Sequence, residues 1–369
     1  MIAPPIPRVL LVSATPRSDR GGVQRMMDRL VETLPAQDLA PVRAGPDETE
    51  PDARLSLEVG AGRDGRPALQ ALPGAGRSLL RLARLLARTR PDVVNLHFVT
   101  GAAAYFFALR PVFRYRLVLS GHGADLLDPM PGMSARLPGF LAAADAVTVV
   151  SDELARVARS RGAPGDRLHM IANGADTAFW RPGPPEAEPG RIVASGRLLP
   201  NKGFDILLEA LAGLPEARCT IAGEGAQRAL LEQRIAELEL CARVRLAGHL
   251  EPEALRDELR RAQLFAMPSR REGMPLALLE ALACGTPAVA TAIGGIPDVL
   301  TAATGIVVPS DDVPAFRAAL AHGLSPESGL SREAARARAE HFSDDACYGR
   351  YAALFRTLAG RDATKMQQP

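Results

Sequence analysis

Two carboxylates, Glu272 and Glu280, frame a helix-forming stretch in the second half of the chain. Glu272 lies in a polar loop, and Glu280 falls inside the run 276–284, whose apolar residues have helical spacing. If the stretch were helical throughout, the two carboxylates would lie about 12 Å apart along the axis. It could then offer one carboxylate to a sugar, the free amides of its first turn to a diphosphate, and the other carboxylate to a ribose. Because this spacing is a weak pattern, two ordinary surface glutamates are the alternative.

A second group of residues that could bind an anion is Arg197 and Lys202. They lie five residues apart in a loop that follows an expected strand and precedes an expected helix. An arginine fork and a lysine point charge suit the two phosphates of a diphosphate. The chain has 44 basic residues, of which only Lys202 and Lys365 are lysines. The use of lysine at position 202 therefore indicates that a compact ammonium is needed there, although codon usage would also explain it.

A histidine between two glycines, His122, follows an expected strand over 116–120. It would therefore lie at the carboxyl edge of a parallel sheet, where open α/β folds bind their ligands. Gly21 and Gly22 follow the first strand, and Gly223, Glu224 and Gly225 follow a strand of the second half. Glycines at these places let a phosphate, ribose or base approach the backbone closely, and plain tight turns are the alternative.

The elements that must position these residues alternate between apolar strands and amphipathic helices. This alternation predicts a doubly wound parallel sheet, and it restarts after the proline-rich segment 181–190. We therefore expect one Rossmann-like domain over 1–180, a linker over 181–190 and a second such domain over 191–342. A last helix over 343–361 should pack back on the first domain, and 362–369 should be a disordered tail.

Composition narrows the class of protein. The chain has 369 residues, 47% hydrophobic and 23% charged, which is typical of a soluble protein with two domains. A net charge of +2 gives no reason to expect nucleic acid, and four scattered cysteines without a C-x-x-C pair predict reduced thiols rather than zinc ligands. No run approaches the ~20 apolar residues of a membrane span, so we expect a cytoplasmic protein.

One helix carries an arginine face. Arg77, Arg81, Arg84 and Arg88 recur at helical spacing, opposite a leucine-rich face. A solvated basic face is the simplest interpretation. The alternative is contact with an anionic acceptor or an anionic membrane, with the protein held peripherally at the inner face of that membrane.

The order of the motifs resembles that of family four of the glycosyltransferases, a large retaining family with the GT-B fold. The matching pieces are the paired glycines at 21–22, GHGAD at 121–125, NGADTAFW at 173–180, GRLLPNKGFDILLEA at 196–210, AGEG at 222–225, EGMPLALLEALACGTPAVAT at 272–291, IGGIPDVL at 293–300 and GIVVP at 305–309. The resemblance implies two Rossmann-like domains that face a central cleft, with the last helix crossing back to the first domain.

The resemblance also implies roles for individual residues. Arg197 and Lys202 would hold the donor diphosphate, Glu272 the sugar hydroxyls, Glu280 the ribose, and His122 would lie beside the sugar. The remaining donor-binding positions would be Gly21, Gly22, Asn173, Gly223, Glu224, Gly225, Leu250, Gly273, Met274, Pro275 and Leu276. Met274 stands where the family commonly has an aromatic residue, and Asn95 where it often has histidine.

The implied activity is transfer of a hexose from a nucleoside-diphosphate sugar to a glycan, lipid-linked or small-molecule acceptor, with retention of configuration. We expect no metal and no other cofactor, because the chain contains no Asp-x-Asp pair to bind a metal–diphosphate complex. A nucleotide-sugar 2-epimerase of the same architecture and an inactive nucleotide-sugar-binding subunit are the alternatives. A nicotinamide-dependent oxidoreductase is disfavoured, since no G-x-G-x-x-G follows the first strand.

Overall fold

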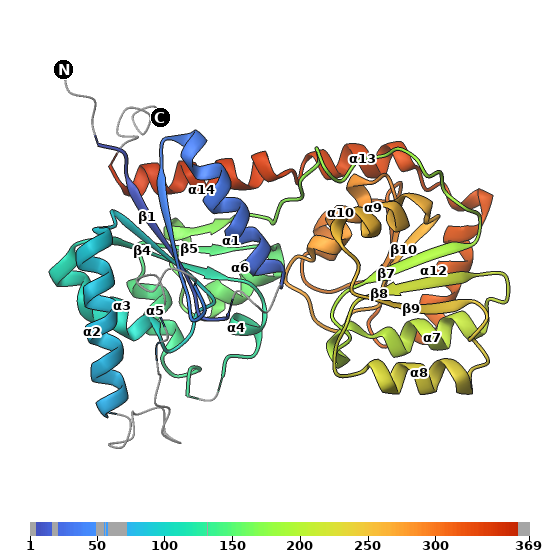
Figure 1. Ribbon diagram of the computed structural model, residues 1–369, viewed down its shortest axis with the longest axis horizontal. Helices are drawn as coiled ribbons and strands as arrows, with labels where there is room; N and C mark the ends of the chain where they lie inside the picture. Colours follow the sequence, from blue (N-terminus) through green and yellow to red (C-terminus); the bar gives the residue numbers. More distant parts are fainter. Residues whose placement is uncertain are drawn as a thin grey trace. The chain divides into compact units, whose positions relative to one another are not determined.

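A computed structural model describes residues 5–16, 21–48, 55, 57, 72–130 and 132–360. The chain divides into two compact units (Figure 1). The first comprises residues 1–172 and 345–369, and the second comprises residues 173–344. The tail expected over 362–369 lies outside the described residues.

The first unit is built on a parallel sheet with the strand order β2-β1-β3-β4-β5-β6. Continuous apolar runs such as that of β1 are buried on both faces, as parallel sheets covered by helices require. The strands are β1 (Arg8–Ser13), β2 (Ala40–Ala44), β3 (Val93–His97), β4 (Arg116–Gly121), β5 (Ala146–Val149) and β6 (Leu168–Met170).

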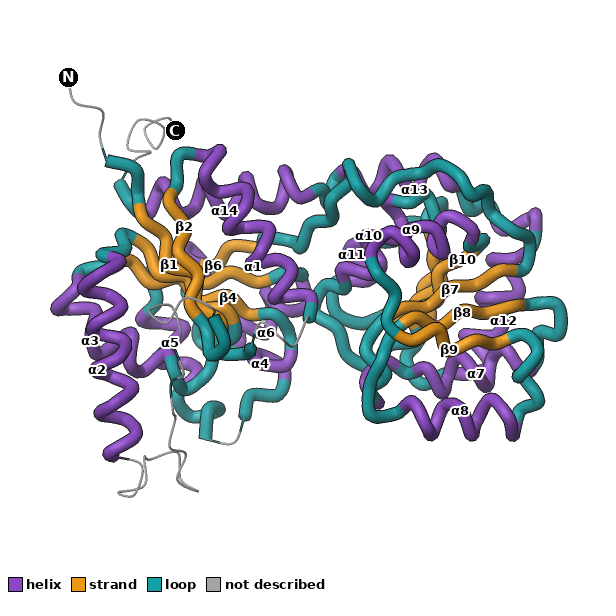
Figure 2. The backbone as a smooth tube through the Cα atoms, viewed as in Figure 1, coloured by secondary structure: helices purple, strands orange, loops and turns teal. Residues whose placement is uncertain are grey.

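Helices cover this sheet on both faces (Figure 2). The helices are α1 (Gly22–Thr33), α2 (Leu72–Thr89), α3 (Ala103–Phe113), α4 (Ala124–Leu127), α5 (Leu137–Ala143), α6 (Asp152–Ser160) and α14 (Asp344–Leu358). The C-terminal helix α14 belongs to this unit, because Tyr348, Tyr351 and Phe355 lie in one buried cluster with Met26 and Leu30 of α1.

The second unit repeats the plan with the strand order β12-β11-β10-β7-β8-β9, all parallel. Its strands are β7 (Arg191–Ser195), β8 (Arg218–Ala222), β9 (Val244–Gly248), β10 (Leu264–Met267), β11 (Ala288–Thr291) and β12 (Gly305–Val308). Its helices are α7 (Phe204–Ala212), α8 (Arg228–Glu237), α9 (Pro252–Arg261), α10 (Leu276–Ala283), α11 (Ile296–Val299), α12 (Val313–Leu324) and α13 (Arg332–Glu340).

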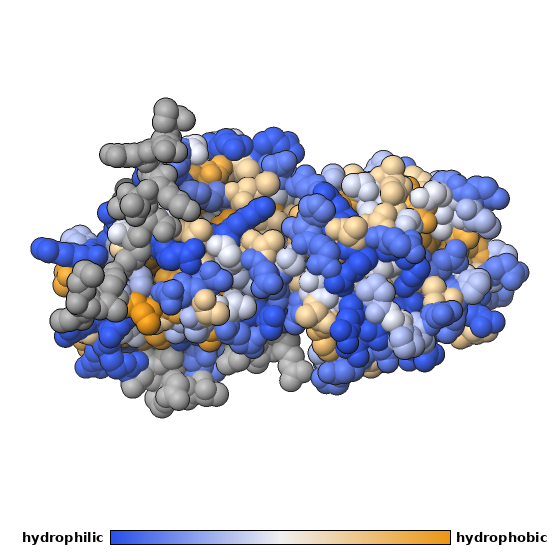
Figure 3. Space-filling model, turned by 90° about the horizontal axis from the view of Figure 1, so that it is seen from above, coloured by the Kyte–Doolittle hydropathy of each residue, from blue (hydrophilic) through white to orange (hydrophobic). Residues whose placement is uncertain are grey.

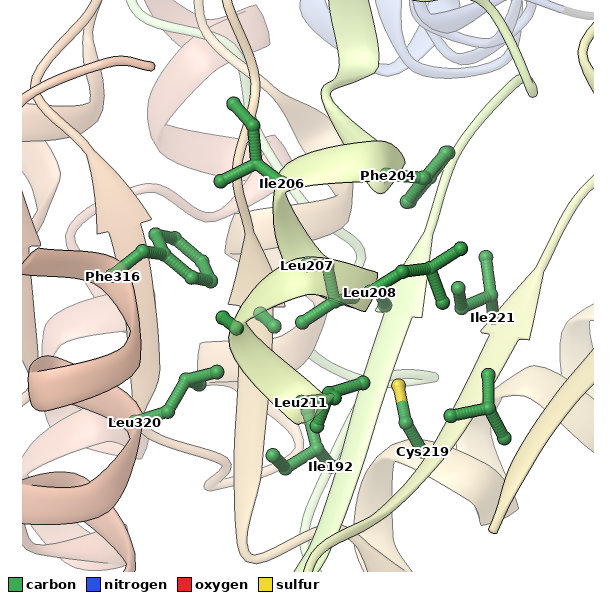
Figure 4. Packing of buried hydrophobic residues seen from close by; sticks show 14 of the residues in the cluster. Ile192, Phe204, Ile206, Leu207, Leu208, Leu211, Cys219, Ile221, Phe316 and Leu320 are labelled. Carbon is green, nitrogen blue, oxygen red and sulfur yellow. The ribbon is translucent and has the colours of Figure 1, made fainter. Parts of the chain in front are cut away.

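A buried apolar cluster fixes α7 and α12 on one face of the second sheet. Phe204, Leu207 and Leu211 of α7 pack with Phe316 and Leu320 of α12 (Figure 4). The packing holds the start of α7, and with it the loop that carries Lys202, against the carboxyl edge of the sheet.

The predicted linker at 181–190 is not where the chain passes between the units. The crossings fall at 172–173 and 344–345, and they run side by side. The amide of Ala175 donates to the carbonyl of Phe342 at 2.9 Å, and the amide of Asp344 donates to the carbonyl of Ala175 at 2.9 Å. A side chain at Gly174 would come within 2.8 Å of a backbone oxygen of this pairing. The glycine therefore permits the close approach of the two crossings.

The proline-rich segment is instead fastened to the second unit. The guanidinium of Arg260 on α9 donates to the carbonyls of Arg181 and Pro184, at 2.8 and 2.9 Å. Prolines and glycines mark an irregular backbone, and they do not show whether that backbone is packed. The composition therefore identified an irregular segment and placed the division of the chain about ten residues too late.

Candidate active site

The second unit has a topological switch point between β7 and β10. These strands are neighbours, but the chain leaves β7 towards β8 and β9, and leaves β10 towards β11 and β12. The loops that follow β7 and β10 therefore diverge and leave room at the carboxyl edge, where doubly wound sheets bind ligands. These two loops contain Arg197, Lys202 and Glu272, three of the residues that the sequence analysis predicted to bind the donor.

Lys202 and Glu272 meet across this switch point. The ammonium Nζ of Lys202 donates to Oε1 of Glu272 at 2.6 Å, and the hydroxyl of Ser269 donates to the same oxygen at 2.8 Å. The side chains are 21% and 9% exposed, so the pair is partly shielded from water. The structure therefore brings together a cation and an acceptor that can each contact a polar ligand.

Arg270 fastens the two loops to each other beside this pair. Its guanidinium makes a bidentate pair with Asp205 at 2.8 and 2.7 Å and also donates to the carbonyl of Pro200 at 2.8 Å. The backbone amide of Arg270 donates to the carbonyl of Asn201 at 2.8 Å. The hydrogen bonds from the Arg270 side chain lower the pKa of Asp205, against the opposing effect of burial. The carboxylate is thus kept charged, and the loop geometry is held without a ligand.

The helix that follows Glu272 is shorter than the sequence predicted. Helix α10 begins at Leu276, with Pro275 in an extended conformation at the N-cap. Residues 272–275 are therefore outside the helix, and the helical rise of about 12 Å between Glu272 and Glu280 does not apply. Glu280 lies about one turn inside α10 and is 4% exposed. A proline can stand in the first turn of a helix or at its N-cap. The presence of Pro275 in the sequence therefore does not distinguish the two positions.

The backbone around Gly273 and Met274 is held from two sides. The side-chain amide of Asn173 donates to the carbonyl of Met274 at 2.7 Å, and the amide of Gly295 donates to the carbonyl of Gly273 at 2.6 Å. A side chain on Gly294 would come within 2.4 Å of the carbonyl of Glu272. These contacts engage the carbonyls of this segment and fix its conformation at the start of α10.

Glycines bring the neighbouring loops into close contact. Gly223 has a φ of +148°, and a side chain there would come within 1.8 Å of the carbonyl of Gly196. Gly225 has a φ of +158°, and a side chain there would overlap the carbonyl of Leu198. The carboxylate of Glu224 pairs at 3.0 Å with Arg228, the first residue of α8. These glycines are needed by the fold itself, whatever the ligand.

Two predicted donor residues have no contact with the Lys202–Glu272 pair among the described hydrogen bonds and ion pairs. Leu250 is half-buried in the loop after β9, which is two strands away from β7 at the edge of the sheet. Arg197 is exposed, and no ion pair joins it to any residue in the described parts of the chain. Arg197 and Lys202 lie in the same loop after β7, and Lys202 is paired with Glu272, so their convergence on one anion stays a prediction.

In the first unit, Gly21 and Gly22 form the start of α1. Gly21 is the N-cap, with the ordinary φ of −74°, and Gly22 is the first helical residue. A side chain on Gly21 would meet no described atom within 4 Å. In contrast to Gly223, the fold around the described atoms does not demand a glycine here, so open space remains next to the helix start.

The loop that carries His122 is held by one carboxylate. Asp125 accepts hydrogen bonds from the amides of His122 and Gly123, both at 3.0 Å, and from the amide of Val99 at 2.9 Å. Burial raises the pKa of Asp125, and these backbone bonds oppose that rise. Asp125 thus joins the loop after β4 to the loop after β3 and sets the position of the His122 backbone.

The imidazole of His122 contacts a second histidine. Nε2 of His122 lies 3.0 Å from Nδ1 of His97, and the ring of Phe98 meets the His122 ring edge-on. Burial lowers the pKa of His122 to about 3, and burial, together with the charges of His122 and Arg43, lowers that of His97. Both rings are therefore neutral at physiological pH. Nδ1 of His122 is buried without a partner among the described residues.

Several residues of the site escaped the sequence analysis. Asn95, His97 and Ser269 were given no role, and Asp125 was quoted only as part of the GHGAD motif. The spacing of Asn95 and His97 did carry a signal, since alternate positions of a strand share one face. Polar residues within an otherwise apolar strand indicate a buried polar contact. Only the fold shows that His122 is the partner of His97.

The described residues contain neither a cluster of metal ligands nor a membrane-spanning helix. No three His, Cys, Asp or Glu side chains come together as a ligand set for a metal ion there. None of the helices in that part of the chain has the length and apolar character needed to cross a bilayer. The face shown in Figure 3 is mostly hydrophilic, with hydrophobic residues in small separate groups.

Comparison with known proteins identifies the family. Residues 176–341 match the family described as glycosyl transferases group 1, and residues 20–179 match glycosyltransferase family 4. A mannosyltransferase of Mycolicibacterium smegmatis, described as GDP-mannose-dependent alpha-(1-6)-phosphatidylinositol monomannoside mannosyltransferase, is 31% identical over 348 residues. That match covers 85% of this chain and 88% of the relative.

A second relative matches over a shorter length. The GDP-mannose-dependent monoacylated alpha-(1-6)-phosphatidylinositol monomannoside mannosyltransferase of Corynebacterium glutamicum is 30% identical over 222 residues, which is 54% of this chain and 58% of that protein. Among solved structures, sucrose-phosphate synthase of Thermosynechococcus elongatus superimposes with a TM-score of 0.81 at 21% identity, over 96% of this chain and 99% of that one.

These matches confirm the predicted doubly wound α/β fold and the predicted enzyme class. The structural likeness supports the fold, because two six-stranded parallel sheets with flanking helices are shared at low identity. The relative that matches over most of its length supports the family. The chain belongs to the group 1 glycosyltransferases of family four and has the GT-B fold.

Proposed function

We propose that this glycosyltransferase moves a hexose from a nucleoside-diphosphate sugar to an acceptor hydroxyl, with retention of configuration and without a metal ion. The observation that supports the proposal most directly is the Lys202–Glu272 pair at the switch point of the second sheet. A cation suited to a diphosphate and a carboxylate suited to sugar hydroxyls lie in contact there. The start of α10, four residues after Glu272, supplies amides for the same ligand.

In the proposed reaction, Lys202 turns from Glu272 to the diphosphate, and Arg197 joins it from the same loop. The bond between the sugar C1 and the phosphate oxygen breaks while a bond from C1 to the acceptor oxygen forms on the same face. The proton of the acceptor hydroxyl passes to the departing phosphate oxygen. The two cations stabilise the negative charge that develops on the leaving diphosphate, which is the role a metal has in other transferases.

Glu272 binds the sugar hydroxyls in this proposal, and Glu280 binds the ribose. His122 of the first unit contacts the transferred sugar as a neutral hydrogen-bonding group, because its pKa is far below physiological pH. The other donor residues are Gly21, Gly22, Asn173, Gly223, Glu224, Gly225, Leu250, Gly273, Met274, Pro275 and Leu276. Of these, Asn173 acts through the backbone, since its amide holds the carbonyl of Met274.

The names of the two mannosyltransferases motivate a specific donor and acceptor. Both are described as GDP-mannose-dependent and as acting on a phosphatidylinositol monomannoside. We therefore propose GDP-mannose as the donor and an anionic, lipid-linked mannoside as the acceptor for this chain.

The arginine face of α2 supports the anionic character of the acceptor. Arg77, Arg81, Arg84 and Arg88 are all exposed, while Leu82, Leu85 and Leu86 on the opposite face are buried. Four cations on one exposed helix face attract a negatively charged lipid surface by about 1 kcal/mol each. We propose that this face holds the enzyme peripherally at an anionic membrane.

The test is a thermal-shift panel of UDP, GDP, ADP, dTDP and their common sugars, with and without EDTA, followed by transfer assays with the stabilising donor. We expect GDP and GDP-mannose to raise the melting temperature equally in both conditions. Anomeric NMR of the product should show an α-linked sugar from an α-linked donor. A β-linked product would contradict retention, and loss of the shift in EDTA would contradict metal independence. Stabilisation without transfer would favour an inactive binding subunit.

A further inference from the structure

A continuous chain of hydrogen-bonding groups runs through the interior of the first unit from α14 to His122. It begins at the hydroxyl of Tyr351, which lies 3.3 Å from that of Thr148 on β5. Thr148 contacts the hydroxyl of Ser120 on β4 at 2.7 Å, and Ser120 donates to Oδ1 of Asn95 on β3 at 2.8 Å. Nδ2 of Asn95 lies 3.1 Å from Nε2 of His97. Nδ1 of His97 then contacts Nε2 of His122 at 3.0 Å.

All the side chains before His122 are buried. The exposed fraction is 1% for Tyr351 and Thr148 and zero for Ser120, Asn95 and His97. Water therefore does not compete for these groups, and an unsatisfied donor would be costly. Each hydroxyl in this series of hydrogen bonds has only one proton to donate, so the direction of one hydrogen bond decides the direction of the others.

The carboxamide of Asn95 links the hydroxyl half of the chain to the imidazole half. Its oxygen can only accept, so the proton of Ser120 points to Asn95, that of Thr148 to Ser120, and that of Tyr351 to Thr148. Its nitrogen can only donate, so Nε2 of His97 accepts. A neutral His97 then carries its proton on Nδ1 and donates to Nε2 of His122.

In the opposite direction, the Tyr351 proton would have only Ser120 as an acceptor among the described residues, because Thr148 would donate to Tyr351. If the Asn95 carboxamide were turned over, Ser120 would donate to Thr148 and Thr148 to Tyr351. In the described residues, the Tyr351 hydroxyl meets only the hydroxyls of Thr148 and Ser120. Burial raises the pKa of Tyr351 to about 12, so the phenol keeps its proton and must place it. The contact that has hydrogen-bond distance is the one with Thr148, at 3.3 Å. Tyr351 therefore favours the direction in which it donates to Thr148 and Ser120 donates to Asn95.

We propose that Tyr351, acting through Thr148, Ser120, Asn95 and His97, fixes His122 as the Nδ1–H tautomer. His122 then presents a hydrogen-bond donor, and the group that it recognises must be an acceptor oxygen. Nδ1 of His122 is the atom that has no partner among the described residues, which is consistent with a place kept for such a ligand. Tyr351, Thr148, Ser120, Asn95 and His97 are positioning residues in this scheme. The statement about the ligand rests on the proposed function, but the tautomer does not.

The test is long-range ¹H–¹⁵N NMR of ligand-free enzyme labelled with ¹⁵N-histidine. The chain has six histidines, so the spectrum is simple, and His122→Gln assigns the signal. We expect the Nδ1–H pattern for His122 in the wild type. Tyr351→Phe should convert it to the Nε2–H pattern or a mixture. Tyr115→Phe is the matched control, because it removes another buried hydroxyl of the same unit that donates to the carbonyl of Phe106, away from the chain.

An Nε2–H pattern in the wild type would overturn the proposal, and so would an unchanged pattern in Tyr351→Phe. Thr148→Val breaks the same chain at the next hydroxyl and provides the answer if Tyr351→Phe does not fold. Adding the donor sugar then separates the two proposals. A His122 signal with the expected tautomer that does not respond to any donor would remove His122 from the sugar site and leave the hydrogen-bond chain intact.

Discussion

The ammonium of Lys202 and the carboxylate of Glu272 lie 2.6 Å apart although they are 70 residues apart in the sequence. Lys202 lies in the loop after β7 and Glu272 in the loop after β10. These loops diverge on opposite sides of the switch point between the two strands. The pair therefore keeps two charged groups compensated in a partly shielded place until a ligand provides other partners. A donor that binds there must replace this ion pair by contacts that are at least as favourable.

Removal of either charge should strongly reduce the rate of transfer. We expect Lys202→Met and Glu272→Gln to lower kcat by about 100-fold to 1,000-fold, as the loss of a group that stabilises transition-state charge does. Lys202→Met should also destabilise the second unit by about 1–3 kcal/mol, because Glu272 loses its charged partner. Transfer assays measure the first effect, and Trp180 fluorescence measures the second, since the only tryptophan lies in that unit.

A control variant shows whether the loss of activity is specific to the Lys202–Glu272 pair. Arg317→Gln changes an exposed contact of the same unit, in which the guanidinium donates to the carbonyl of Glu209. It should leave kcat within about twofold, as surface substitutions usually do. Near-normal turnover of Glu272→Gln would remove Glu272 from the reaction.

Two glycines of the motifs should respond in opposite ways to alanine. In Gly223→Ala the new carbon would overlap the carbonyl of Gly196 at 1.8 Å and adopt a φ of +148°, so the second unit should lose about 2 kcal/mol or more. In Gly21→Ala the new carbon meets no described atom, so stability should change by less than about 0.5 kcal/mol.

Activity then decides what Gly21 does. If the donor approaches the backbone at Gly21, the alanine variant should keep its melting temperature and show a raised KM for the donor. An unchanged KM would mean that Gly21 is only the cap of α1.

The sequence predicted the elements well because their signals are local. The strands around Val9, Val193 and Val289 are continuous apolar runs, and each is buried on both of its faces within a parallel sheet. Lys202 and Glu272 could be selected because motif spacing places them in loops after strands. Their mutual contact could not be predicted, because it depends on the order β10-β7, which no local pattern encodes.

The interior polar residues of the first unit were the least predictable. Tyr351 lies 203 residues after Thr148, and its aromatic character indicated only that one face of α14 is buried. Asn95 and Ser120 each interrupt an apolar strand, which is a visible sign of a buried contact, but the partner of each lies on a different strand. Pairing of polar groups across a sheet needs the register, and the register is a property of the fold.

The arginine face of α2 should control binding to anionic vesicles. We expect Arg81→Gln/Arg84→Gln to weaken binding to vesicles that contain phosphatidylinositol by about tenfold or more, since each lost cation costs about 1 kcal/mol of attraction. Sedimentation with vesicles at low and high salt measures this. Arg156→Gln/Arg159→Gln is the control, because it removes two exposed arginines from α6 of the same unit. Equal loss in both variants would indicate attraction by net charge rather than by α2.

The buried neutral histidines should make the first unit sensitive to acid. The folded-state pKa of His122 is about 3, below the ordinary value of 6.5, so the unfolded chain takes up a proton first as the pH falls. This part of the stability is fully present above pH 6.5 and is lost progressively towards pH 3. His97 and His169, whose pKa values are also lowered by burial, add to the effect. The slope should approach about 1.4 kcal/mol per pH unit for each histidine.

The measurement is urea unfolding between pH 7 and pH 5, followed by the near-UV signal of the tyrosines. All four tyrosines lie in the first unit, so they report on it separately from Trp180. His122→Gln removes one of the three histidines of the first unit whose pKa is lowered and should reduce the slope, whereas His249→Gln removes an exposed histidine of the second unit and should not change it. A wild-type slope near zero would show that these rings become protonated in the folded unit, because folding would then not exclude the protons that the unfolded chain binds.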